Sequence, residues 1–68
     1  MDEIFGLWLI AQHRREDAVG MLAFQARRDA TFPYGATPDE VGAYLKRKGA
    51  QPDALDTLEA AAIEWGHA

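Results

Sequence analysis

The sequence predicts an all-α protein, a compact bundle of four helices (five at most). Apolar residues recur at intervals of three and four along four segments of the chain, which is the helical period. Proline, glycine and capping residues separate these segments, and no segment alternates with the period of two that a strand would show. A chain of 68 residues supports one domain, so we assign residues 1–68 to a single helical domain with a thin stability margin.

The first helix is expected over residues 3–12, in the segment "EIFGLWLIAQ". Phe5, Trp8 and Leu9 lie at helical spacing, and apolar side chains cover much of the circumference. A helix that is apolar nearly all round is usually buried. We therefore expect this helix near the centre of the core.

The second helix is expected over residues 18–30. Asp17 is a good N-cap, and the apolar stripe that follows comprises Val19, Leu22, Ala23 and Ala26. Gly20 lies inside this helix, where glycine costs about 1 kcal/mol relative to alanine. A glycine at such a position suggests close approach by another helix, which we place around Trp8.

The third helix is expected over residues 38–48 and the fourth over 52–66. "TPDE" has the pattern of a capping box, with Thr37 as N-cap and Glu40 three residues later. Gly49 follows "KRK" and suits the left-handed position after a helix. Proline at the start and Gly66 at the end delimit the fourth helix, whose apolar face comprises Leu55, Leu58, Ala62 and Trp65.

Several segments together resemble the YozE-type sterile-alpha-motif-like (SAM-like) domains of bacteria and their phages. The similar segments are, in order, "FGLWLIAQ", "REDAVGMLA", "RDATFP", "EVGAYLKRKGA" and "AAAIEW". Ala18 is a departure, because relatives often carry proline just after the capping aspartate. The resemblance covers almost the whole chain and implies a SAM-like helical bundle. The family has no established biochemical activity, so the resemblance indicates a fold and no function.

The stretch "RDATFP" is expected to form a structural corner. We expect Phe32 to turn back into the core and Pro33 to end the second helix. Asp29 is expected to accept hydrogen bonds from turn amides.

Catalysis and metal binding find little support in the sequence. The chain contains no cysteine and no serine, and its only histidines are His13 and His67. A metal site needs three or four ligands within reach, and nucleophilic catalysis needs a nucleophile, a base and an orienting group. We therefore predict that the protein is not an enzyme and holds neither a metal nor a cofactor.

Basic residues collect at two helix ends, where helix dipoles favour them. They are Arg27 and Arg28 in one cluster and Lys46, Arg47 and Lys48 in the other. If the two clusters met on one face, they would form a site for an anionic partner such as a nucleic acid. The net charge of −4 argues against that partner. The last helix carries four acidic residues, Asp53, Asp56, Glu59 and Glu64. We interpret them as a face that is exposed to solvent. The alternative is that they dock to a basic partner.

Met21 and Phe24 fall off the apolar stripe of the second helix and are expected to form an exposed patch, which would mark a partner or dimer contact. The preferred hypothesis is a non-enzymatic protein-interaction module, an adaptor or modulator in a phage or mobile-element setting, that binds another protein or itself. The alternative is a nucleic-acid-binding module that uses the basic helix ends. With no apolar run long enough for a bilayer and no secretory signal, we expect a cytoplasmic protein that does not bind membranes.

Overall fold

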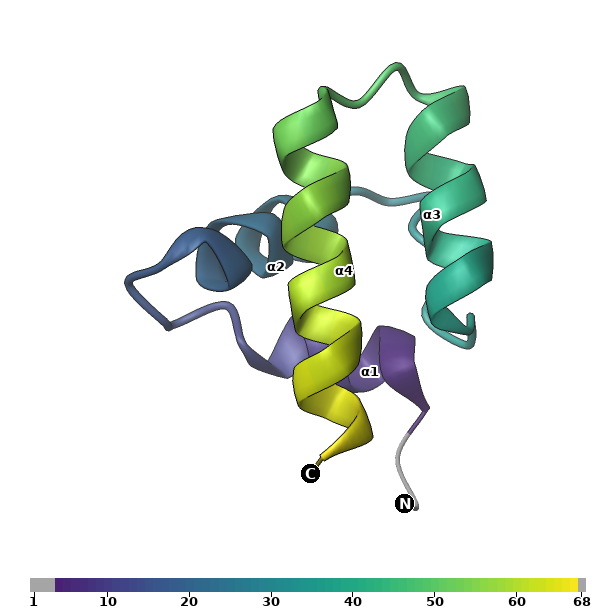
Figure 1. Ribbon diagram of the computed structural model, residues 1–68. Coiled ribbons are helices and arrows are strands. Elements are labelled where there is room, and N and C mark those ends of the chain that lie inside the picture. The colour runs from purple at the N-terminus through teal and green to yellow at the C-terminus, as the bar shows by residue number, and fades with distance from the viewer. Residues whose placement is uncertain (1–3, 68) are drawn as a thin grey trace.

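The computed structural model describes residues 4–67 as four helices and no strand (Figure 1). The helices are α1 (Phe5–Ala11), α2 (Ala18–Arg28), α3 (Pro38–Arg47) and α4 (Pro52–Gly66). The prediction of a small all-α bundle is therefore confirmed for this part of the chain.

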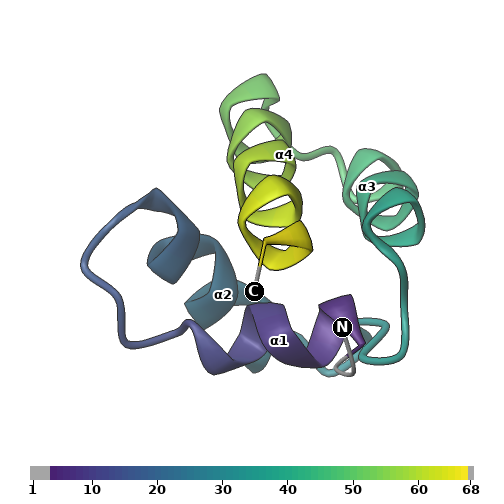
Figure 2. The same cartoon turned by 60° about the horizontal axis from the view of Figure 1, so that its bottom comes forward.

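The fourth helix is the central element of the bundle. It contacts each of the other three helices, and α1 contacts all of them as well. Figure 2 shows α4 standing over α1, with α2 on one side and α3 on the other. The core that these helices enclose comprises Phe5, Leu9, Val19, Leu22, Ala23, Ala26, Phe32, Ala36, Val41, Leu58 and Ala61.

The helix boundaries follow the predicted caps. The Asp17 side chain accepts a hydrogen bond from the Gly20 amide at 2.8 Å, and the Thr37 side chain forms the complete capping box with Glu40. Gly49 adopts a positive φ of 80° directly after α3. These features depend on residues that are close in sequence, and all of them are as predicted.

Two boundaries differ from the prediction by two residues, and α1 and α3 each end one residue earlier than predicted. The second helix ends at Arg28 instead of residue 30. Asp29 leaves helical geometry, and its side chain accepts a hydrogen bond from the Thr31 amide. The first helix begins at Phe5, with Ile4 as an N-cap that makes no side-chain hydrogen bond. Residue 3, where this helix was expected to begin, lies outside the described residues.

The interpretation of Gly20 is wrong. A Cβ atom at this position would lie 1.9 Å from the carbonyl oxygen of Arg15, so the close neighbour is the connection before α2. No part of α1 around Trp8 approaches the glycine this closely. The chain folds back over the start of its own helix, and a residue with a side chain has no room there.

The first helix is central but not fully enclosed. Phe5 and Leu9 are buried, whereas Leu7 is exposed and Trp8 is half-buried. Phe5 makes an edge contact with Trp65 of α4, with ring centroids 5.5 Å apart. The Gly6 amide donates to the carbonyl of Ala36 at 3.2 Å, which attaches α1 to the corner between α2 and α3.

Candidate functional site

A hydrogen-bonded corner joins the end of α2 to α3, and it carries the "RDATFP" stretch. The Tyr44 hydroxyl of α3 donates a hydrogen bond to the Asp29 carboxylate. The Thr31 hydroxyl lies 2.7 Å from the Tyr44 hydroxyl and 2.9 Å from the Asp29 carboxylate. Because the Tyr44 proton is already used, Thr31 donates to one of these two oxygens. The Tyr44 hydroxyl, with the Thr31 amide and hydroxyl, lowers the pKa of Asp29 to about 2. Phe32 is buried as predicted, with its ring edge-on to that of Tyr44.

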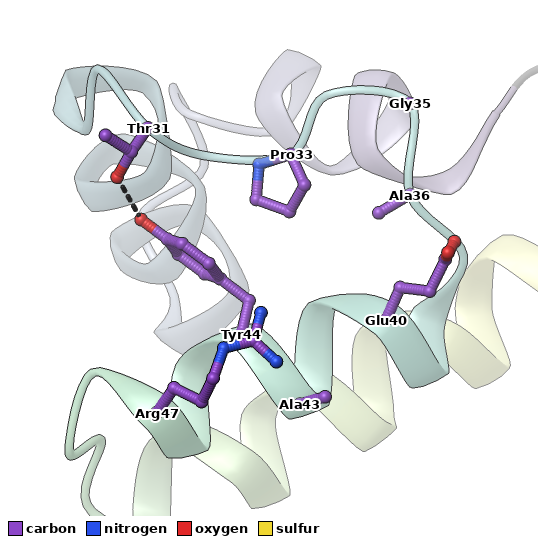
Figure 3. A pocket seen from close by; sticks show the side chains of 8 residues that line it. All are labelled: Thr31, Pro33, Gly35, Ala36, Glu40, Ala43, Tyr44 and Arg47. Atoms are coloured by element: carbon purple, nitrogen blue, oxygen red, sulfur yellow. Dashed lines mark hydrogen bonds between the residues drawn. The ribbon is translucent and has the colours of Figure 1, made fainter.

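An open groove lies between this corner and α3. Figure 3 shows its walls, with the Thr31–Tyr44 hydrogen bond at one end and Glu40 at the other. Small residues line the rest of it, with Pro33, Gly35 and Ala36 on the side of the corner and Ala43 on α3 opposite them. The Glu40 side chain accepts a hydrogen bond in the capping box. Arg47 is the other charged residue that lines the groove, and its side chain makes no hydrogen bond or ion pair with the described residues.

The three basic residues at the end of α3 lie in different surroundings. Lys46 lines a groove between α3 and α4 beside Glu59, whereas Arg47 lines the groove of Figure 3. Lys48 alone turns toward the end of α2, where its ammonium group lies 5.6 Å from the centre of the Tyr44 ring and near Asp29. The three cations thus have different surroundings, and the structure brings one of them close to the end of α2.

The outer face of α2 carries the apolar residues predicted to be exposed. Met21 is 65% exposed and Phe24 is 44% exposed, so both side chains meet solvent. Arg28 lies over the Phe24 ring, 5.5 Å from its centre. We call the row Asp17, Met21, Phe24 and Arg28 the α2 stripe; it runs along one side of the helix at intervals of four, three and four residues.

Hollows lie on both sides of Met21. One, of about 190 Å³, is lined by His13, Arg15, Gly20, Met21, Phe24 and Gln25. The other, of about 640 Å³, lies between α2 and the turn that joins α3 to α4, and Met21, Leu22, Leu45 and Ala54 are among its lining residues. Met21 is therefore a ridge between two depressions.

An ion-pair cluster fixes the connection before α2. The Arg15 guanidinium contacts Glu64 of α4 at 2.5 Å and Asp17 at 2.7 Å. The Glu64 and then the Asp17 hydrogen bonds raise the pKa of Arg15, and Arg15 in turn lowers the pKa of Asp17. With one cation and two anions the cluster has a net charge of −1, and it withdraws Glu64 from the predicted acidic surface of α4.

Sequence reasoning missed this cluster and the larger hollow. The Arg15–Glu64 pair joins residues 49 positions apart, and no local pattern signals such a pair. The hollow depends on how α2 meets the α3–α4 turn. The exposure of Met21 and Phe24 could be predicted, because apolar residues that fall outside a helical stripe are visible in the sequence.

The described residues contain no group of three potential metal ligands among histidine, cysteine, aspartate and glutamate. No polar or charged residue in this part of the chain is buried. None of the helices between residues 4 and 67 has the length and apolar character needed to cross a bilayer. Comparison with protein-family models, curated proteins and solved structures gives no match to this chain.

Proposed function

We propose that this chain is a non-enzymatic protein-interaction module whose docking surface is the outer face of α2. The supporting observation is the exposure of Met21 and Phe24 side by side on one helix, with a hollow on each side of Met21. Contiguous exposed apolar side chains rimmed by polar residues are typical of protein contact surfaces. Methionine suits such a surface because its flexible thioether adapts to partners of different shape.

The proposal includes membership of the YozE-type SAM-like domains, which rests on the sequence motifs, and a cytoplasmic setting in a bacterium or phage. The four-helix architecture is compatible with that membership. The role proposed is that of an adaptor or modulator. Binding of nucleic acid through the basic helix ends has less support, because Lys46, Arg47 and Lys48 face different surroundings.

The test is capture of partners from host lysate by immobilised chain, with and without nuclease, compared among three versions. The first is the natural sequence and the second carries Met21→Lys and Phe24→Lys. The third is a matched control with Leu7→Lys and Ile63→Lys, which are 47% and 58% exposed on other helices. Met21 and Ile63 are the more exposed pair, and their substitution should change stability by less than about 0.5 kcal/mol. Phe24 and Leu7 are each about half buried, so the two double variants lose similar amounts of packing and are matched in this respect.

We expect one stoichiometric protein that survives nuclease, binds the natural chain and the control equally, and is lost with the α2 variant. A partner that binds the α2 variant as well as the natural chain would contradict the assignment of this surface. Binding that disappears with nuclease would favour the basic helix ends instead.

A further inference from the structure

The α2 stripe is complementary to itself. Its two apolar members, Met21 and Phe24, lie in the middle, and its two charged members, Asp17 and Arg28, lie at the ends with opposite sign. When two copies of α2 run antiparallel, Met21 of each faces Phe24 of the other. The same register places Asp17 opposite Arg28 at both ends, because both pairs are symmetric about the midpoint of the stripe.

The charges around the two ends of α2 reinforce this register. The end near Asp17 carries the cluster with Arg15 and Glu64, whose net charge is −1. The opposite end carries Arg27 and Arg28, with Lys48, the residue after α3, close by. Antiparallel packing brings each negative end against a positive end, although two copies of a chain with net charge −4 repel each other at long range.

The shape of the surface around Met21 also suits antiparallel packing of two α2 helices. Met21 forms a ridge with a hollow on either side, and helices pack by placing ridges of one into grooves of the other. In a two-fold pair both partners present the ridge and the hollow, so each ridge has a place on the opposite copy. Two-fold symmetric dimers are also the commonest oligomers of soluble proteins.

We propose that this chain self-associates as a two-fold dimer through antiparallel packing of α2 against α2 of a second copy. The proposal rests on the assignment of α2 as the docking surface and names a second copy as its occupant. The helix has 11 residues and is about 16 Å long, so the contact is smaller than the roughly 800 Å² per partner of a standard interface. The dimer is therefore weak and forms at high concentration, and a protein partner that takes the same surface competes with it.

Sedimentation equilibrium from about 10 µM to 1 mM covers the range expected of a small interface. The natural chain is expected to approach twice its monomer mass of 7.5 kDa with rising concentration. Met21→Lys should raise the dissociation constant on the order of a hundredfold, because each dimer contains the substitution twice. Ile63→Lys should leave it unchanged. A natural chain that is monomeric throughout, or a dimer that Met21→Lys leaves intact, would overturn the proposal.

A charge exchange tests the register separately. Arg28→Glu places two carboxylates together at each end and should weaken the dimer. Adding Asp17→Asn to that variant removes the repulsion while keeping a good N-cap, since asparagine caps as well as aspartate does. Recovery of association in the double variant supports the Asp17–Arg28 pairing, and a double variant no better than Arg28→Glu alone refutes it.

Cysteine cross-linking gives a third readout, because the chain contains no natural cysteine. An equimolar mixture of Met21→Cys and Phe24→Cys chains should form the mixed disulfide well beyond the one-half share that random pairing gives, since only unlike positions face each other. A ratio of about 1:2:1 among the three products, as random pairing gives, would contradict the antiparallel register. If self-association fails but captured partners still depend on Met21 and Phe24, the dimer is refuted and the proposed function stands. A dimer through α2 without any captured protein refutes the adaptor function instead.

Discussion

Replacement of Gly20 by alanine is expected to destabilise the protein, although the residue lies inside a helix where alanine is normally favoured. The helix propensity gain is about 1 kcal/mol. Against it stands the new Cβ atom, which would lie 1.9 Å from the carbonyl oxygen of Arg15 and 2.6 Å from the carbonyl carbon. These are backbone atoms, so relief requires the connection before α2 to move.

Overpacking of this kind costs about 1 to 3 kcal/mol. Movement of the connection also disturbs the hydrogen bond from the Gly20 amide to Asp17, and loss of an N-cap costs about 1 kcal/mol. After subtraction of the propensity gain, the free energy of unfolding should fall by about 1 to 3 kcal/mol. For a domain of this size the melting temperature should fall by roughly 5 to 20 °C.

Gly42 provides the matched control, since it also lies inside a helix but has room for a side chain. A Cβ atom there would meet only the Leu58 Cδ2 atom, at the ordinary contact distance of 3.5 Å. Gly42→Ala should therefore stabilise the protein by about 0.5 to 1 kcal/mol. Thermal and urea unfolding followed by far-ultraviolet circular dichroism would measure both variants. A Gly20→Ala protein as stable as Gly42→Ala would refute the close approach of the connection.

Three other perturbations test the core, the corner and a cap. Leu9→Ala removes a completely buried side chain and should cost about 2 to 5 kcal/mol, enough to leave much of the protein unfolded at 25 °C; a cooperative melt near that of the natural chain would contradict this. Carbon-detected NMR titration should place the pKa of Asp29 near 2, and Tyr44→Phe should move it back toward its usual 3.8. Because the pKa of Asp29 is lowered on folding, its stabilising effect is complete above pH 4 and lost as the pH falls toward 2; an Asp29 pKa unchanged by Tyr44→Phe would refute the role of that hydroxyl. Thr37→Ala removes the capping box and should lower the free energy of unfolding by about 1 kcal/mol, seen as a lower urea midpoint, whereas an unchanged midpoint would count against the cap.

The local features of this protein could be predicted because their causes lie within a few residues. The caps at Asp17 and Thr37, the left-handed Gly49 and the buried Phe32 all follow from short motifs. The interpretation of Gly20 failed because a glycine inside a helix indicates that another segment approaches closely but not which segment it is.

Some features of the candidate site could be predicted from nearby residues, and others could not. Exposure of Met21 and Phe24 was predictable, because the buried side of α2 was already occupied by other residues. The hollows beside Met21 were not predictable, since they depend on the angle between α2 and the α3–α4 turn. The different directions of Lys46, Arg47 and Lys48 follow from their rotation around α3, but their neighbours come from other parts of the chain.

The hydrogen bond from Gly6 to Ala36 has a consequence for how the protein opens. A helix of seven residues is too short to persist alone in water, so α1 keeps its shape only while it is packed on α2 and α4 and attached to the corner. The amides of α1 and those of the corner should therefore exchange with solvent deuterium together, as one cooperative unit. Although α1 precedes the other three helices along the chain, it would become ordered only after the corner and α4 have been synthesised and folded onto it.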